Sequence, residues 1–274
     1  APAPAAPAEA PASRLPRRNP VDKKVAEIAA AIEQRRMEVY LNPIVGLGDY
    51  AVTHFEVMVR LRSAHGEIID QPEQTLTLAG DDILSLFDIE RLNRASEVAA
   101  QLEARGKTGA LLSATLGRSM SDSAFLEAFV QTFDSRNSIS GQLVLTFTQA
   151  DVSTFGSGAW QALGDMHAFG FRFALDAVTH LDMDFPALAH SGFAFVKLPA
   201  DVFLQGLADA HGFVPPSDIC RHLAQSGLTL VVGSVNDDTT LGRVFGFGAL
   251  FGQGQLFGGS RQIALDKLPR QSAA

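Results

Sequence analysis

The segment Ala51-Val52-Thr53-His54-Phe55-Glu56-Val57-Met58-Val59-Arg60 is rich in apolar and β-branched residues, and we predict that it forms one strand. Successive side chains of a strand point to opposite faces, so Glu56, Met58 and Arg60 share one face. Charged side chains on a buried strand are costly unless they pair with each other or bind a ligand. The segment therefore indicates either an internal Glu56–Arg60 ion pair or a polar site built on this strand.

The composition is typical of a globular α/β domain. The chain has 274 residues, of which 46% are apolar, so it is long enough to bury a sizeable core. Its 22 basic and 30 acidic residues give a net charge of −8, which disfavours a nucleic-acid polymer as partner but allows a small phosphate ligand. No apolar run is long enough to span a bilayer, and the first residues lack the pattern of a signal peptide. The single cysteine, Cys220, excludes an internal disulfide and is typical of a reducing compartment.

Three regions follow one another along the chain. Residues 1–20 are rich in Ala and Pro, and we expect them to form a disordered linker. Residues 21–37 carry apolar side chains at helical spacing, which predicts an amphipathic leading helix. The folded domain is expected to occupy residues 38–268, and the linker before it indicates a fragment of a longer protein.

Alternating strand-like and helical segments predict a (β/α)8 barrel. Helical patterns are found at residues 81–104, 156–169, 216–226 and 237–245. Strand candidates are found at residues 39–45, 52–61, 110–113, 143–147, 171–175, 193–198, 228–232 and 249–251. The turn at residues 46–49 is too short for a parallel crossover, so we predict a modified barrel with one antiparallel strand.

Isolated charges lie at the ends of two predicted strands. Asp176 directly follows residues 171–175, and Lys197 lies near the end of residues 193–198. In (β/α)8 barrels the C-terminal ends of the strands carry the binding or catalytic residues. Asp also commonly opens loops, and Lys also extends from strand ends into solvent. Together with the two charges of the opening segment, however, the pattern favours a site at this end of the barrel.

Several motifs, taken in order, resemble the EAL domain, the family of phosphodiesterases that hydrolyse cyclic di-GMP. Glu56-Val57-Met58-Val59-Arg60 is similar to the signature E-A-L-L-R. Further similar segments are Tyr40-Leu41-Asn42-Pro43-Ile44-Val45 (Y-Q-P-I-V), Leu175-Asp176 (L-D-D-F-G), Val196-Lys197-Leu198 (K-[IL]-D) and Gly252-Gln253-Gly254-Gln255-Leu256-Phe257 (Q-G-Y-L-F). The resemblance implies a TIM-like barrel of the EAL type with one antiparallel strand. In the family's enzymes, Asn and several carboxylates hold two divalent cations.

Most of those metal-ligand positions are neutral in this chain. They are Ser113 for the Asn of N-x-S, Thr146 and Gln149 for E-[IV]-T-E, Ala177 for the second Asp of D-D-F-G, Gly233 and Asn236 for A-E-G-V-E, and Pro199 for the Asp of K-[IL]-D. Glu56 and Asp176 remain, which is enough for one weakly held ion but too few for a catalytic pair. The resemblance therefore implies a degenerate EAL domain that is not an enzyme, with no catalytic residues and no metal cofactor.

Ligand binding can persist where hydrolysis is lost. In the family the Arg of the signature contacts a ligand phosphate, so the resemblance implies this role for Arg60, whose planar guanidinium can engage two phosphate oxygens. Glu56 would accept a hydrogen bond from a guanine edge or position Arg60. The alternative is that these residues are remnants that contact one another in a pocket that no longer binds a ligand. The implied ligand-binding residues for cyclic di-GMP are Asn42, Glu56, Met58, Arg60, Asp176, Lys197 and Gln253.

The hypothesis that results is a cyclic di-GMP receptor that relays ligand binding to a protein partner. A protein-interaction module without nucleotide binding and a weak phosphodiesterase are the alternatives. A degenerate EAL domain behind a linker resembles flagellar-positioning proteins with N-terminal membrane segments. That resemblance implies a bacterial scaffold or flagellar partner, and a cytoplasmic domain tethered to the inner membrane through upstream segments. The loop at residues 178–180 differs from the loop through which EAL domains often pair, which leaves dimer formation open.

Overall fold

A computed structural model of the protein describes residues 20–69, 72–77, 81–133, 139–210 and 212–265. The expected linker at residues 1–20 lies outside the described residues, except for Pro20. That residue is the first of α1 (Pro20–Glu33). The predicted leading helix therefore ends four residues early, because Arg35 adopts a left-handed φ of 52° and β1 begins at Met37.

A closed barrel forms the centre of the fold. Its strands are β1 (Met37–Gly46), β2 (Val52–Leu61), β3 (Leu111–Ala114), β4 (Leu143–Thr148), β5 (Arg172–Asp176), β6 (Phe193–Pro199), β9 (Thr229–Gly233) and β10 (Phe251–Gly252). They pair in the order β10-β9-β6-β5-β4-β3-β2-β1, and a further pairing of β10 with β1 closes the ring. β1 is antiparallel to both β2 and β10, whereas the other neighbours are parallel. The predicted barrel with one antiparallel strand is confirmed.

Two short pairings were not predicted. β11 (Arg261–Ile263) pairs antiparallel with residues 39–41 of β1, because β10 covers only Val45 and Gly46 at the other end of that long strand. A separate hairpin consists of β7 (Leu207–Asp209) and β8 (Gly212–Val214). These strands are three residues long, too short to show alternation in the sequence.

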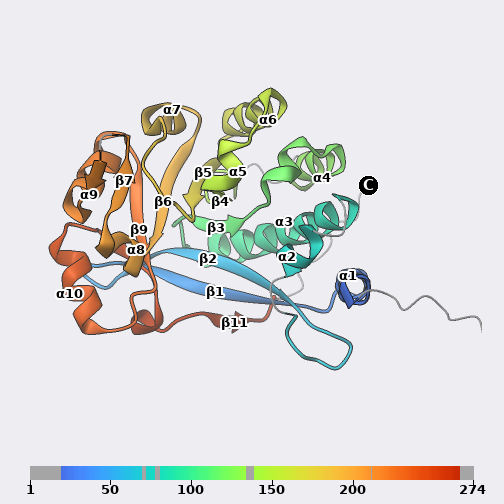
Figure 1. Ribbon diagram of the computed structural model, residues 1–274. Helices are drawn as coiled ribbons and strands as arrows, with labels where there is room; N and C mark the ends of the chain where they lie inside the picture. Colours follow the sequence, from blue (N-terminus) through green and yellow to red (C-terminus); the bar gives the residue numbers. More distant parts are fainter. Residues whose placement is uncertain (1–19, 70–71, 78–80, 134–138, 211, 266–274) are drawn as a thin grey trace, which may run out of the picture.

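Helices surround the barrel (Figure 1). After α1, they are α2 (Pro72–Thr77), α3 (Asp81–Ala104), α4 (Ser123–Phe133), α5 (Gln149–Ser153), α6 (Ser157–Ala168), α7 (Phe185–His190), α8 (Ala200–Gln205), α9 (Pro216–Gln225) and α10 (Asp238–Gly246). The β1–β2 ribbon extends beyond the barrel toward α1 and α2 (Figure 1), where Leu61 packs in a small core with Ile28 and Ile32. No described helix combines the length and the apolar character that crossing a bilayer requires.

The barrel interior is apolar below its mouth. Outward-facing side chains of the strands pack against the helices in the main core. Inward-facing side chains form a second cluster that includes Ile44, Leu112, Val144, Phe195 and Val231. Because this cluster fills the barrel, polar side chains that point inward are confined to the ends of the strands.

A histidine of the opening segment lies at the end of the barrel where β2 begins. His54 accepts a hydrogen bond at Nδ1 from the Ala110 N–H (3.0 Å), and its ring lies 5.4 Å from the Phe195 ring and 5.3 Å from the Phe251 ring. Burial, with a contribution from Arg172, lowers the pKa of His54. Burial therefore favours the neutral imidazole at this end of the barrel.

A strained residue follows β5 and gives a stability prediction. Ala177 has a φ of 52°, in the left-handed region where a Cβ is crowded, and its side chain is exposed. We expect Ala177→Gly to raise the free energy of unfolding by roughly 0.5–1 kcal/mol, because the relief of about 1–2 kcal/mol exceeds the entropy cost of glycine. Urea unfolding followed by circular dichroism measures the change.

The matched control is Ala224→Gly, at an exposed position in the last turn of α9. There the φ is helical, so the same substitution should lower the free energy of unfolding by about 1 kcal/mol. Equal destabilisation by both substitutions would show that residue 177 is not strained.

Candidate functional site

Four of the predicted site residues meet at the C-terminal end of the barrel strands. The Lys197 ammonium on β6 lies 2.5 Å from Glu56 Oε1 on β2 and 3.2 Å from Asp176 Oδ2 at the end of β5. The other oxygen of Glu56, Oε2, accepts a hydrogen bond of 2.9 Å from Gln253 Nε2. Residues separated by up to 197 positions in the sequence are thus joined in one polar network.

The ammonium of Lys197 is shared by two neighbouring carboxylates. Its side chain is 10% exposed, against 15% for Glu56 and 35% for Asp176. Burial by itself lowers the pKa of Lys197, but Glu56 and Asp176 outweigh burial and raise the pKa above its ordinary value. Lys197 is therefore protonated, and its hydrogen bonds are committed to protein carboxylates.

Above this network lies a cavity of about 410 Å³. Two buried oxygens in residues that line it, Asn42 Oδ1 and Ser260 Oγ, have no hydrogen-bond partner within the described part of the chain. Leaving such groups unpaired costs about 1–3 kcal/mol each, so polar groups are buried behind this wall at a cost in stability. Asn42 lies opposite Glu56 in the β1–β2 register.

Arg60 contributes a cation to the cavity wall that no described acid neutralises. No carboxylate of the described residues lies within 4.0 Å of its guanidinium, whose contact is with the Tyr40 ring, 4.5 Å from Cζ to the centroid. The first alternative from the sequence, an internal Glu56–Arg60 pair, is therefore wrong. Glu56 pairs with Lys197, while Arg60 and Met58 face the cavity.

The cavity is also lined by residues that are not among the seven predicted ligand-binding residues. Ser234, Asn236 and Gln255 line it, from the loops after β9 and β10. Asn236 Oδ1 accepts a hydrogen bond from the Gln255 N–H (3.0 Å), which joins the two loops. Ser234 has a φ of 58°, a strained conformation of the kind that gathers at functional sites. These residues could have been found from their position in the sequence, because both loops directly follow predicted barrel strands.

β3 turns a different residue inward than the motif match predicts. Leu111 packs in the main core and Leu112 in the barrel interior, so the alternation directs Ser113 outward and Ala114 inward. The prediction that Ser113 occupies the Asn ligand position of the family is wrong. Ala114, which has no ligand oxygen, is at that inward position.

The donor set at the mouth does not fit a pair of divalent cations. Among the described residues, no group of three or more His, Cys, Asp or Glu side chains could hold a metal ion. Glu56 and Asp176 share the ammonium of Lys197, and Thr146 offers only a buried hydroxyl that lacks a partner there. A two-metal centre needs several hard oxygen ligands around each cation, and these residues do not supply them.

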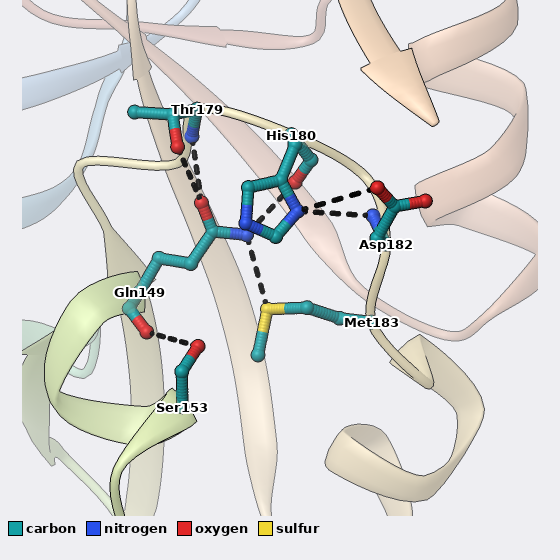
Figure 2. A network of polar contacts seen from close by, with 6 residues as sticks. All are labelled: Gln149, Ser153, Thr179, His180, Asp182 and Met183. Carbon is teal, nitrogen blue, oxygen red and sulfur yellow. Dashed lines mark hydrogen bonds and ion pairs between the residues drawn. The ribbon is translucent and has the colours of Figure 1, made fainter. Parts of the chain in front are cut away.

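Gln149, which the sequence comparison matched to the last Glu of E-[IV]-T-E, anchors the loop at residues 177–184. Figure 2 shows its buried amide inside this loop. Oε1 accepts hydrogen bonds from the Thr179 N–H (2.7 Å) and hydroxyl (3.1 Å), and Nε2 donates to the His180 carbonyl (2.8 Å) and to Met183 Sδ (3.2 Å). An ionised glutamate at this position could not donate the bonds to His180 and Met183. The observed loop conformation therefore requires an amide rather than a carboxylate.

Comparison with known proteins adds a family. The family model of the EAL domain matches residues 25–260. No curated protein matches the chain.

Solved structures with the same fold include the FimX EAL domain from Pseudomonas aeruginosa bound to c-di-GMP. It is 19% identical to this chain, with a TM-score of 0.72 over 89% of this chain and 98% of that one. The Xanthomonas citri FimX EAL domain in complex with c-di-GMP is 18% identical (TM-score 0.72, 89% and 95% covered). The PaMucR phosphodiesterase in a c-di-GMP complex is 17% identical (TM-score 0.71, 88% and 97% covered). Since the family model spans the barrel from α1 to the loop before β11, this chain belongs to the EAL domain family.

Proposed function

We propose that this domain is a receptor that binds cyclic di-GMP without hydrolysing it and relays the bound state to a protein partner. The observation that carries the proposal is the unequal use of two cations at the mouth. Lys197 is committed to two carboxylates, whereas Arg60 lines the cavity and its N–H donors have no partner among the residues that the structure describes. A free guanidinium in a polar cavity suits a phosphate.

The other cavity residues supply polar partners for a nucleotide. Asn42 and Gln253 bring amides to the cavity wall, and amides can hydrogen-bond a base or a ribose hydroxyl. Met58 offers a flexible apolar contact for a base. Similar folds with c-di-GMP bound, those of the two FimX domains and PaMucR, support this choice of ligand.

Binding without hydrolysis is proposed from the charges at the mouth. The attacking water of a metal-dependent phosphodiesterase is activated by cations held between carboxylates. Here Glu56 and Asp176 hold the lysine ammonium instead. An ammonium has no open coordination position for water, so it cannot lower the pKa of a bound water as a metal ion does.

The proposed biological role is in flagellar assembly or positioning. The partner would be a bacterial scaffold or flagellar protein, and upstream segments would tether the domain to the inner membrane. The resemblance noted from the sequence supports this role. The free Arg60 favours the receptor over an interaction module that has lost nucleotide binding.

One prediction of the proposed function concerns the contact between Arg60 and a ligand phosphate. Arg60→Ala should weaken binding of cyclic di-GMP by roughly 10- to 100-fold, because charge-assisted hydrogen bonds worth about 1.5–3 kcal/mol are lost. Isothermal titration calorimetry measures the effect. Arg243→Ala, on the exposed surface of α10, is the control and should bind as the parent does. Unchanged affinity of a folded Arg60→Ala variant would disprove the proposed pocket.

The second prediction concerns divalent cations. The dissociation constant for cyclic di-GMP should be the same in EDTA as with millimolar Mg²⁺ or Mn²⁺, because the Lys197 ammonium already lies between the two carboxylates that a cation would need. Calorimetry measures binding, and chromatography of the incubated nucleotide should reveal no linear product. An active phosphodiesterase of the family, assayed alongside, controls for the nucleotide and the ions. Metal-dependent appearance of the linear dinucleotide, lost in Glu56→Ala, would support an enzyme instead.

A further inference from the structure

We infer that Arg62 is a positioning residue that keeps Arg60 available to the ligand by holding Glu38 away from it. The inference rests on the proposed function, because it explains how the phosphate-binding cation stays free. Glu38 and Arg62 are not among the residues that line the cavity. Their effect on the ligand would therefore act through Arg60.

The strand register places an acid directly opposite Arg60. In the antiparallel β1–β2 pair, Glu38 is the partner of Arg60. Opposite charges on facing positions of two strands lie about 5 Å apart at Cβ and normally form an ion pair. Such a pair would occupy the guanidinium that the cavity presents, so its absence here needs a physical cause.

The cause is a competing pair with the next arginine on the same face. Arg62 Nε lies 2.6 Å from Glu38 Oε1, and Arg62 Nη2 donates to Glu38 Oε2 at 2.8 Å. Glu38 Oε2 also accepts the Tyr40 hydroxyl at 2.8 Å. Both oxygens of Glu38 are thereby used, in a two-bond geometry that a carboxylate and a guanidinium match well.

The backbone fixes Arg62 in place. Its N–H donates to the Arg36 carbonyl (2.8 Å), its own carbonyl accepts from Arg36 Nη1 (2.6 Å), and its guanidinium donates to the Gly66 carbonyl. The Glu38 side chain is 18% exposed and that of Arg62 is 34% exposed, so water screens the pair only in part. Arg62 is thus ordered before any ligand arrives.

Arg60 is left with an aromatic ring as its contact. Its Cζ lies over the Tyr40 ring, and the Tyr40 hydroxyl is held by Glu38. A ring face attracts the cation without accepting its in-plane N–H groups, which remain free for phosphate oxygens. Without Arg62, the ionised Glu38 would have Arg60 as its nearest cross-strand cation, and the ligand would have to break that pair.

The test measures cyclic di-GMP binding by calorimetry to the parent, Arg62→Met and Arg62→Met/Glu38→Gln proteins, each first shown to be folded by thermal melting. We expect Arg62→Met to bind about five- to tenfold more weakly, the scale of a partly exposed ion pair. The double variant should recover to within about threefold of the parent, because the neutral amide introduced on β1 no longer competes for Arg60. A damaged fold would not be repaired by a second substitution.

Arg221→Met is the matched control, since it breaks a surface pair with Asp218 on α9 and should bind as the parent does. Parental affinity in Arg62→Met, or a double variant as weak as the single one, would overturn the inference while leaving the receptor intact. If the parent binds no cyclic di-GMP, the receptor proposal falls. A crystal structure of ligand-free Arg62→Met then decides the inference alone: an Arg60–Glu38 ion pair supports it, and Arg60 still over Tyr40 refutes it.

Discussion

The ion network of Lys197, Glu56 and Asp176 is the constraint on which the mouth of the barrel depends. The interior beneath it is apolar, so two carboxylates can point inward only if a cation compensates them. β2, β5 and β6 each bring one member, and loss of the Lys197 ammonium would leave the largely buried Glu56 carboxylate without a cation, at a cost of roughly 3–5 kcal/mol. The protein's own ammonium fills this role, which is the physical basis for proposing a site that selects a ligand rather than an ion.

The antiparallel β1–β2 hairpin explains why Arg60, unlike Lys197, is not paired with a carboxylate of the described residues. β1 and β2 face each other over their whole length, so acids and bases on their shared face are cross-strand neighbours. Two arginines of β2 and its extension, Arg60 and Arg62, lie near Glu38. Glu38 forms its ion pair with Arg62, and Arg60 packs over the Tyr40 ring instead. If β1 and β2 were parallel, Glu38 would not lie opposite Arg60. The departure from a standard barrel is therefore part of how the cavity acquires an uncommitted cation.

Much of the fold could be predicted from the sequence. The eight barrel strands are apolar runs, and the short turn after β1 forces an antiparallel pair, so both were recognised from local patterns. β7, β8 and β11 were not, because pairing over three residues depends on neighbours distant in the sequence. The end of the leading helix was placed too late, since residues 34–37 lack a Pro or Gly to mark the left-handed turn at Arg35. Ser113 was misassigned for a related reason, because a motif match does not fix which face of a strand a residue occupies.

For the candidate site, the sequence by itself determined which residue types are available and that they gather at one end of a barrel. Glu56, Asp176 and Lys197 follow or end apolar strands, and that position alone predicts a shared mouth. Only the tertiary structure decided the pairing. The sequence left a pairing of Glu56 with Arg60 open, yet Glu56 binds a lysine 141 positions away. Pair choice depends on distances of a few ångströms between strands, which closure of the barrel sets and local sequence does not encode.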